Sequence, residues 1–274
     1  MLAALIIVFR EAFEAGLVVG IVMAVTRGVH GRSLWISAGV VAGVVGACIV
    51  AAFAGALSQA FAGAGQELFN ATILAVAVAM LTWHNVWMAR HGRELAAEMR
   101  AAGEAVIAGS KSLAGLAIVV GIAVLREGFE LVLFLYGVVA AGGSTALGIV
   151  SGSVIGLLLA CLVCFLTYFG LLNIPGRYLF TVTSIMIAFL SAGMASQAIA
   201  FLDQANVVTA LDSIVWDTSW ILSEDSLVGR ALHTLIGYSD QPTAMQLLVY
   251  CLTLAATFGL MKLFAPQHQA SPAH

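Results

Sequence analysis

The chain has 274 residues, of which 62% are hydrophobic and only 9% are charged, and its formal net charge is −3. Soluble globular domains carry about 25% charged residues, so this composition, with a mean hydropathy of +1.05, excludes a soluble domain. It indicates an integral membrane protein, and we expect no nucleic-acid partner.

Apolar stretches recur along the chain, each long enough for a membrane-crossing helix, which takes about 20 residues. They fall at 2–25, 35–57, 67–88, 113–140, 145–170, 178–200 and 244–264. The sequence therefore predicts an all-α, polytopic membrane protein with seven transmembrane helices. A secretory signal needs a basic segment before its apolar core. The first basic residue here is Arg10, so we expect 2–25 to be a retained helix.

All the cysteines lie inside these apolar stretches: Cys48, Cys161, Cys164 and Cys251. Disulfide frameworks form where thiols meet an oxidising aqueous compartment. We therefore expect no disulfide.

Basic residues are distributed unevenly between the two sides of the predicted membrane protein. With the N-terminus outside, eight of them face the cytoplasm and only Arg230 faces outward. Because cytoplasmic loops carry the excess of Lys and Arg, we expect an N-out, C-in chain in the cytoplasmic membrane. The eight are Arg27, Arg32, Arg90, Arg93, Arg100, Lys111, Arg177 and Lys262.

An internal repeat relates the two halves of the chain. Leu125–Glu130 repeats Phe9–Glu14 at an offset of 116 positions. Two further matches follow, of Gly39, Gly43 and Cys48 with Gly152, Gly156 and Cys161, and of Leu68, Phe69 and Thr72 with Leu179, Phe180 and Thr183. Three helices in each copy would insert the second copy upside down. We expect a single membrane domain of two inverted repeats (1–88 and 113–200), a cytoplasmic linker helix (89–112), an acidic outer loop (201–243) and a seventh helix (244–264).

The repeated motif places charges in the middle of two predicted membrane helices. Two glutamates three positions apart share one face of a helix, and an arginine four positions before the second glutamate lies beside it. The motif residues are Arg10, Glu11 and Glu14, and Arg126, Glu127 and Glu130. Each charge at the bilayer centre costs at least about 2.5–3.5 kcal/mol, and two arginines leave two of the four glutamates uncompensated. We therefore expect a cation, or bound protons, to complete a site of these four glutamates, with both arginines as supporting charges.

The oxygen donors of such a site narrow the choice of ion. Carboxylates favour a hard ion over copper or a structural zinc, and Fe³⁺ fits, but the spacing leaves Fe²⁺, Mn²⁺ and Ca²⁺ open. A permease for divalent metals such as Fe²⁺, Mn²⁺ or Pb²⁺ would share every feature. A di-iron redox enzyme is a lesser alternative, because such bundles usually contain Glu-x-x-His pairs and this chain has none.

Arg-Glu-x-x-Glu at Arg10–Glu14 and again at Arg126–Glu130, in a chain of this length, resembles the high-affinity iron permeases of fungi and the related bacterial ferrous/ferric uptake permeases. The resemblance covers nearly the whole chain. It implies a transporter, not an enzyme, in which the four glutamates bind iron during translocation and the two arginines are required beside them. It also implies iron as substrate, without a permanent cofactor. A partner outside the membrane would oxidise or deliver the iron, and we accordingly expect Fe³⁺ to be transported.

Other polar residues suggest where an ion would enter and leave. An acidic outer segment raises the local cation concentration, and the resemblance includes an acidic motif there, which Asp217-Thr218-Ser219-Trp220 matches only in part. Glu67 also suits a helix start, where a carboxylate complements the dipole. The candidates are Glu67, Asp203, Asp217, Glu224 and Asp225 for the entrance, and His84, Glu94 and Glu98 for the exit. An interfacial, hydrogen-bonded histidine is the competing interpretation of His84.

Overall fold

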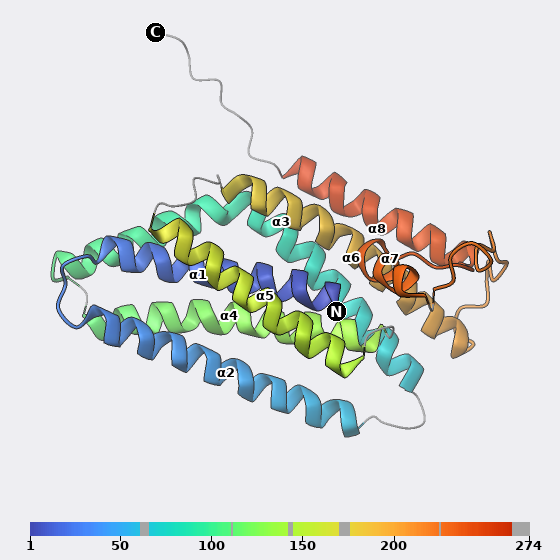
Figure 1. The fold of residues 1–274 in the computed structure, drawn as a ribbon, viewed down its shortest axis with the longest axis horizontal. Coiled ribbons are helices and arrows are strands. Elements are labelled where there is room, and N and C mark those ends of the chain that lie inside the picture. The colour runs from blue at the N-terminus through green and yellow to red at the C-terminus, as the bar shows by residue number, and fades with distance from the viewer. Residues whose placement is uncertain (61–65, 111, 142–144, 170–175, 225, 265–274) are drawn as a thin grey trace, which may run out of the picture.

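The computed structural model describes residues 1–60, 66–110, 112–141, 145–169, 176–224 and 226–264. Over these ranges the chain forms a bundle of helices, with one isolated β-bridge between Ile214 and Thr243. The helices are α1 (Leu2–Val25), α2 (Arg32–Ala60), α3 (Gln66–Ile107), α4 (Leu113–Ala140), α5 (Ala146–Tyr168), α6 (Gly176–Gln204), α7 (Leu227–Ile236) and α8 (Ala244–Leu263). The long helices lie side by side and successive ones run in opposite directions, with the short α7 at one end of the bundle (Figure 1).

The described helices have the character of a membrane protein. Five segments are long and apolar enough to cross a bilayer: Arg32–Ala56, Gln66–Met88, Ala146–Tyr168, Thr181–Gln204 and Ala244–Leu263. Helices α1 and α4 are also long, but each contains one arginine and two glutamates. Large apolar side chains are exposed on the outer surface, among them Phe53 and Leu147, as expected where a surface faces lipid. The prediction of an all-α, polytopic membrane protein is confirmed, while the count of seven spans stays a prediction.

Small residues bring the helices close together. Helix α4 packs along α2, α1 along α5, and α3 along α6, while α1, α3 and α4 meet one another in the centre. A Cβ atom at Gly39 would collide with the carbonyl oxygen of Ala117, and one at Gly152 with that of Met1. Glycines at such positions allow backbones to approach closely in membrane bundles. The four cysteines are free, as expected.

Two clusters of buried apolar side chains fill the interior, one on each side of the charged segments of α1 and α4. The first cluster joins α1, α3, α4 and α6 through Ala3, Ile6, Ile7, Leu74, Ala77, Leu81, Phe134, Val138, Ile187, Leu190, Met194 and Ala198. The second cluster joins α1, α2, α3 and α4 through Val18, Val22, Ile36, Met99, Val106, Leu116, Val120 and Val124. The charged residues therefore lie between two apolar layers.

Helix α3 differs from the sequence prediction in its length. A membrane helix was expected to end at 88 and a separate solvated helix to follow, whereas α3 continues without interruption to Ile107. Its last turns are not simply solvated, because Met99 and Val106 are buried in the second cluster. The exposed side chains of Glu94 and Glu98 on the same segment agree with the polar face that the sequence shows. Amphipathic helices bury one stripe in this way.

The segment between α6 and α8 folds back onto the bundle instead of forming an open loop. It contains α7, which the sequence did not predict, with Ser226 as N-cap and Gly237 as a left-handed C-cap at φ 69°. Gly237 lies directly against Gly193 of α6, a contact for which only glycine leaves room. The Tyr238 hydroxyl donates to the carbonyl of Leu222 at 2.8 Å, so hydrogen bonds within the segment also fix its shape.

Candidate metal centre

The two charged motifs form the same local arrangement on α1 and α4. Nε of Arg10 lies 2.8 Å from Oε1 of Glu14, and Nε of Arg126 lies 3.2 Å from Oε1 of Glu130. Both are the i, i+4 pairs that helical geometry predicts. Their surroundings differ, because Arg10 is buried by neighbouring helices whereas the guanidinium of Arg126 is covered on one side by Trp87, 4.3 Å from the ring centre.

Carboxylates from both motifs converge on one point in the centre of the bundle. One ligand atom from each of Glu11, His84, Glu127 and Glu130 lies within 4.8 Å of the others. All four side chains are buried, with at most 7% of each residue exposed. Three of the four glutamates that the sequence predicts as ligands therefore lie together. Glu14, the fourth predicted ligand, lies outside this group and faces Arg10 and His84.

His84, which the sequence offers as a candidate exit residue, lies within this centre. Its Nε2 atom lies 3.5 Å from Oε2 of Glu14, and its Nδ1 atom contacts Oε2 of Glu130. The sequence interpretation placed it at the inner end of a helix, because the predicted span ended at 88. A usable signal was the spacing of His84 after Leu74, Ala77 and Leu81, which are all buried and share one face of α3.

Several polar atoms at the centre are buried without a hydrogen bond to the described residues. They include both carboxylate oxygens of Glu11, Nη1 of Arg10 and Oε2 of Glu127. A buried polar group without a partner costs about 1–3 kcal/mol, and more if it is charged. A bound cation would supply partners to the carboxylate oxygens, so this chemistry fits an ion that the site binds as cargo.

The candidate entrance and exit residues lie apart from the centre. Asp217 and Glu67 are exposed, Asp203 and Glu224 are half-buried, and Asp225 lies outside the described residues. None of the described candidates other than His84 joins the four-residue group. Glu94 is near His91, at 3.8 Å, and remains on the exposed part of α3.

Two acidic side chains of the outer segment have specific partners. Ser219 donates its hydroxyl and its amide to Asp217, which lowers the pKa of that carboxyl. His233 lies 3.0 Å from Glu224, and the contact lowers the pKa of Glu224 and raises that of His233. Asp217, which is exposed, can therefore attract cations, whereas Glu224 is paired with His233.

A bundle with apolar outer faces and a carboxylate-rich centre buried between two apolar layers defines a membrane transporter for a cation. The chain belongs to the iron permease FTR1 family, whose model matches residues 1–266. It is 31% identical over 258 residues to the ferrous iron permease EfeU of Yersinia pestis, which covers 93% of this chain and 90% of that protein. It is 30% identical over 260 residues to EfeU of Escherichia coli O6:H1, with 93% and 92% covered. No solved structure matches the chain. The relatives are named permeases, in agreement with a transporter and not an enzyme.

Proposed function

We propose that this protein carries iron into the cell through the buried centre, with the glutamates of the two Arg-Glu-x-x-Glu motifs as its ligands. The observation that carries the proposal is the convergence of Glu11 with Glu127 and Glu130 between two apolar layers. An ion at this depth needs protein oxygens to replace its hydration shell. Glu14, held by Arg10, would join the ligands when the helices rearrange.

The charge of the centre favours a divalent ion. Four glutamates and two arginines sum to −2 when His84 is neutral, which is the form of an imidazole that binds a metal. One Fe²⁺ cancels this charge, whereas Fe³⁺ leaves an excess positive charge in a low-dielectric site. We therefore propose Fe²⁺ as the transported ion, in agreement with the ferrous iron named for the relatives.

Fe³⁺ is the second candidate. Three converging carboxylates are hard oxygen donors, which suit a small, highly charged ion. In that case a partner outside the membrane would oxidise iron or deliver it at the acidic outer segment. Transport of Mn²⁺ or Pb²⁺ would use the same ligands, and a di-iron redox centre would need two ions in the same group of residues.

Seven membrane-spanning helices in two inverted repeats would explain the packing of the bundle. The first helix of each repeat packs on the second helix of the other, α1 on α5 and α4 on α2. Gly39 meets Ala117 as Gly152 meets Met1, and the two pairs are related by the offsets of the repeat. Helices α1 and α4 run in opposite directions (Figure 1). These contacts support repeats at 1–88 and 113–200, followed by α8 as a seventh span.

The direction of transport follows from the orientation that the basic residues favour. With the N-terminus outside, the segment 201–243 lies on the outer side of the cytoplasmic membrane and the end of α3 on the inner side. Glu67, Asp203, Asp217, Glu224 and Asp225 would then attract iron at the entrance, and Glu94 and Glu98 would receive it at the exit. Because the centre is sealed by both apolar clusters, opening requires the repeats to move relative to each other.

Uptake into proteoliposomes tests this function. Purified protein would be reconstituted and given radioactive Fe²⁺ with ascorbate, chelated Fe³⁺, or Mn²⁺, with and without a proton gradient. We expect Fe²⁺ uptake that Glu127→Gln abolishes and that the control Glu104→Gln, at an exposed position of α3 outside the proposed path, leaves intact. Uptake of Fe³⁺ but not Fe²⁺ would select the second candidate. Equal uptake of iron by wild type and Glu127→Gln would refute the proposed site.

A further inference from the structure

We propose that His84 is a direct ligand of the transported ion and that it makes the centre select transition-metal ions over Ca²⁺ and Mg²⁺. This inference rests on the proposed function of the centre. The Arg-Glu-x-x-Glu motifs contain carboxylates and protonated guanidinium groups, but no imidazole that could bind a metal ion through nitrogen. The imidazole is supplied by a different helix, α3, which packs against both charged helices.

The imidazole ring of His84 lies between glutamates of the two motifs, where it could bind the same ion as both. Its two nitrogen atoms face Glu14 of α1 and Glu130 of α4, and one of them belongs to the four-residue group with Glu11 and Glu127. Only 3% of the residue is exposed. The ring therefore contacts the glutamates themselves and lies where an ion held by them would be.

Neighbouring residues hold this stretch of α3 in place. Nδ2 of Asn85 donates to the carbonyl of Ser184 at 3.0 Å, and the Thr82 hydroxyl lies 3.3 Å from that of Ser191. Both partners are on α6, so α3 is attached to α6 on either side of His84. The ring of Phe134 lies edge-on to the imidazole, with the ring centres 6.4 Å apart. Ligands fixed by surrounding contacts in this way favour a defined coordination geometry.

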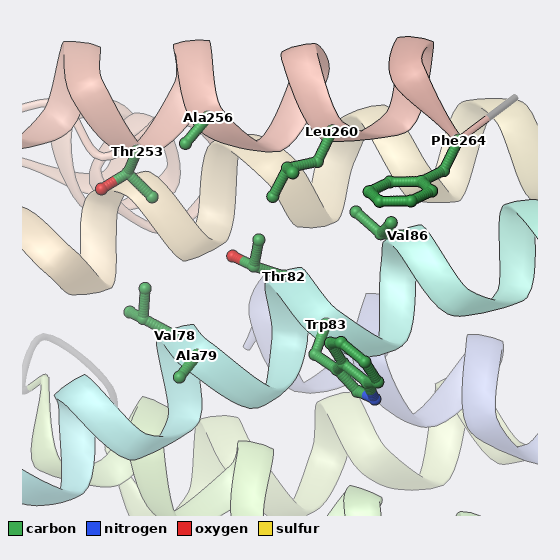
Figure 2. A pocket seen from close by; sticks show the side chains of 9 residues that line it. All are labelled: Val78, Ala79, Thr82, Trp83, Val86, Thr253, Ala256, Leu260 and Phe264. Carbon is green, nitrogen blue, oxygen red and sulfur yellow. The ribbon is translucent and has the colours of Figure 1, made fainter.

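The opposite side of this part of α3 offers no comparable ligands. A hollow of about 400 Å³ lies between α3 and α8 (Figure 2). None of the residues that line it is charged or a histidine: they are Val78, Ala79, Thr82, Trp83, Val86, Thr253, Ala256, Leu260 and Phe264. Among the described residues, carboxylate and imidazole groups therefore lie on the side of α3 that carries His84 and not around this hollow.

Imidazole changes which ions the centre prefers. Ca²⁺ and Mg²⁺ are hard ions that take oxygen ligands almost exclusively, whereas Fe²⁺ and other first-row transition metals bind imidazole well. A centre of carboxylates alone would also accept Ca²⁺ and Mg²⁺. With one nitrogen among the ligands, the same centre would discriminate against both ions.

Pulsed electron paramagnetic resonance with Mn²⁺ as the probe tests the ligand directly. Mn²⁺ bound to purified wild-type protein should show modulation from a coordinated ¹⁴N nucleus. We expect His84→Gln and His84→Asn to lose this modulation, and His91→Gln, a half-exposed histidine on the same helix, to retain it. Size-exclusion profiles identify folded variants. Persistence of the ¹⁴N signal in folded His84 variants would overturn the inference.

Competition in proteoliposomes tests the selectivity. Residues that hydrogen-bond to a metal ligand typically change metal affinity by about 10–100-fold. Loss of the ligand itself in His84→Gln should therefore lower the Ca²⁺ concentration that halves Fe²⁺ uptake by at least about tenfold. Unchanged inhibition by Ca²⁺ in His84→Gln would contradict the selectivity. If wild type binds Mn²⁺ through His84 but takes up no iron, the proposed function fails and the ligand assignment stands. If iron uptake requires Glu127 but the ¹⁴N signal is unchanged in the His84 variants, the ligand assignment fails and the proposed function stands.

Discussion

Arg10 and Glu14 form an ion pair of 2.8 Å in which the two side chains are only 1% and 3% exposed. The corresponding pair of Arg126 and Glu130 is longer, at 3.2 Å, and the arginine side chain is 36% exposed. The same motif thus occurs twice in different surroundings. In the first copy the arginine offsets the charge of a glutamate in a fully enclosed place, whereas in the second it remains accessible beside Trp87.

Removal of the two arginines should therefore have unequal effects on stability. Loss of one partner of a buried ion pair costs about 3–5 kcal/mol, whereas the partly exposed side chain of Arg126 can extend its charged group toward water. We expect Arg10→Gln to lower the thermal unfolding temperature in detergent much more than Arg126→Gln. The double variant Arg10→Gln with Glu14→Gln should recover part of the loss. Equal destabilisation by the two single variants would contradict the difference in burial.

The glycines at the helix contacts should be intolerant of even one methyl group. Gly39→Ala places a Cβ against the carbonyl oxygen of Ala117 and must push α2 away from α4. Gly20→Ala is a matched control, because a Cβ there meets nothing within 4 Å and alanine favours a helix by about 0.8–1 kcal/mol over glycine. We expect thermal unfolding in detergent to show a lower midpoint for Gly39→Ala only. A midpoint unchanged by Gly39→Ala would show that the two helices are not in close contact.

The pair of Glu224 and His233 should make the outer segment most stable at mildly acidic pH. The lowered pKa of Glu224 means that its contribution is complete above the ordinary value of 4.5 and is lost as pH falls through the lower, folded value. The raised pKa of His233 means that its contribution is complete below 6.5 and is lost as pH rises through the higher, folded value. Protection of α7 from proteolysis should therefore be greatest between pH 4.5 and pH 6.5.

Substitution of the histidine separates this effect from a general influence of pH. His233→Gln should remove the loss of protection on the alkaline side, whereas His30→Gln, an exposed histidine outside this segment, should leave the profile unchanged. An unaltered alkaline limb in His233→Gln would exclude the pair as its cause.

The orientation of the chain can be tested with single cysteines in a variant that lacks the native ones. Glu94→Cys and Asp217→Cys both replace exposed side chains, on the end of α3 and in the outer segment. In intact cells a membrane-impermeant thiol reagent should label the cysteine at 217 rapidly and the one at 94 only after permeabilisation. The opposite result would reverse the N-out, C-in topology.

The sequence by itself determined those features that depend on composition and on spacing within one helix. Its hydropathy indicated an all-α membrane protein, and the intervals within Arg10–Glu14 and Arg126–Glu130 predicted the ion pairs, because residues four apart are neighbours on any α-helix. These inferences need no knowledge of how one helix is rotated against another. The offset repeat also predicted that all four motif glutamates would meet, whereas the structure groups Glu11 with Glu127 and Glu130 and places Glu14 beside Arg10.

Only the tertiary structure decided which further side chains reach the centre and what encloses it. His84 joins the glutamates because packing of α3 against α6 turns that face of the helix inward, and a rotation of this kind leaves no trace in local spacing. The unbroken course of α3 and the fold of the segment around α7 likewise depend on burial of Met99 and on contact of Gly237 with α6. Hydropathy does not distinguish an apolar face that meets lipid from one that meets another helix, since both favour the same residues.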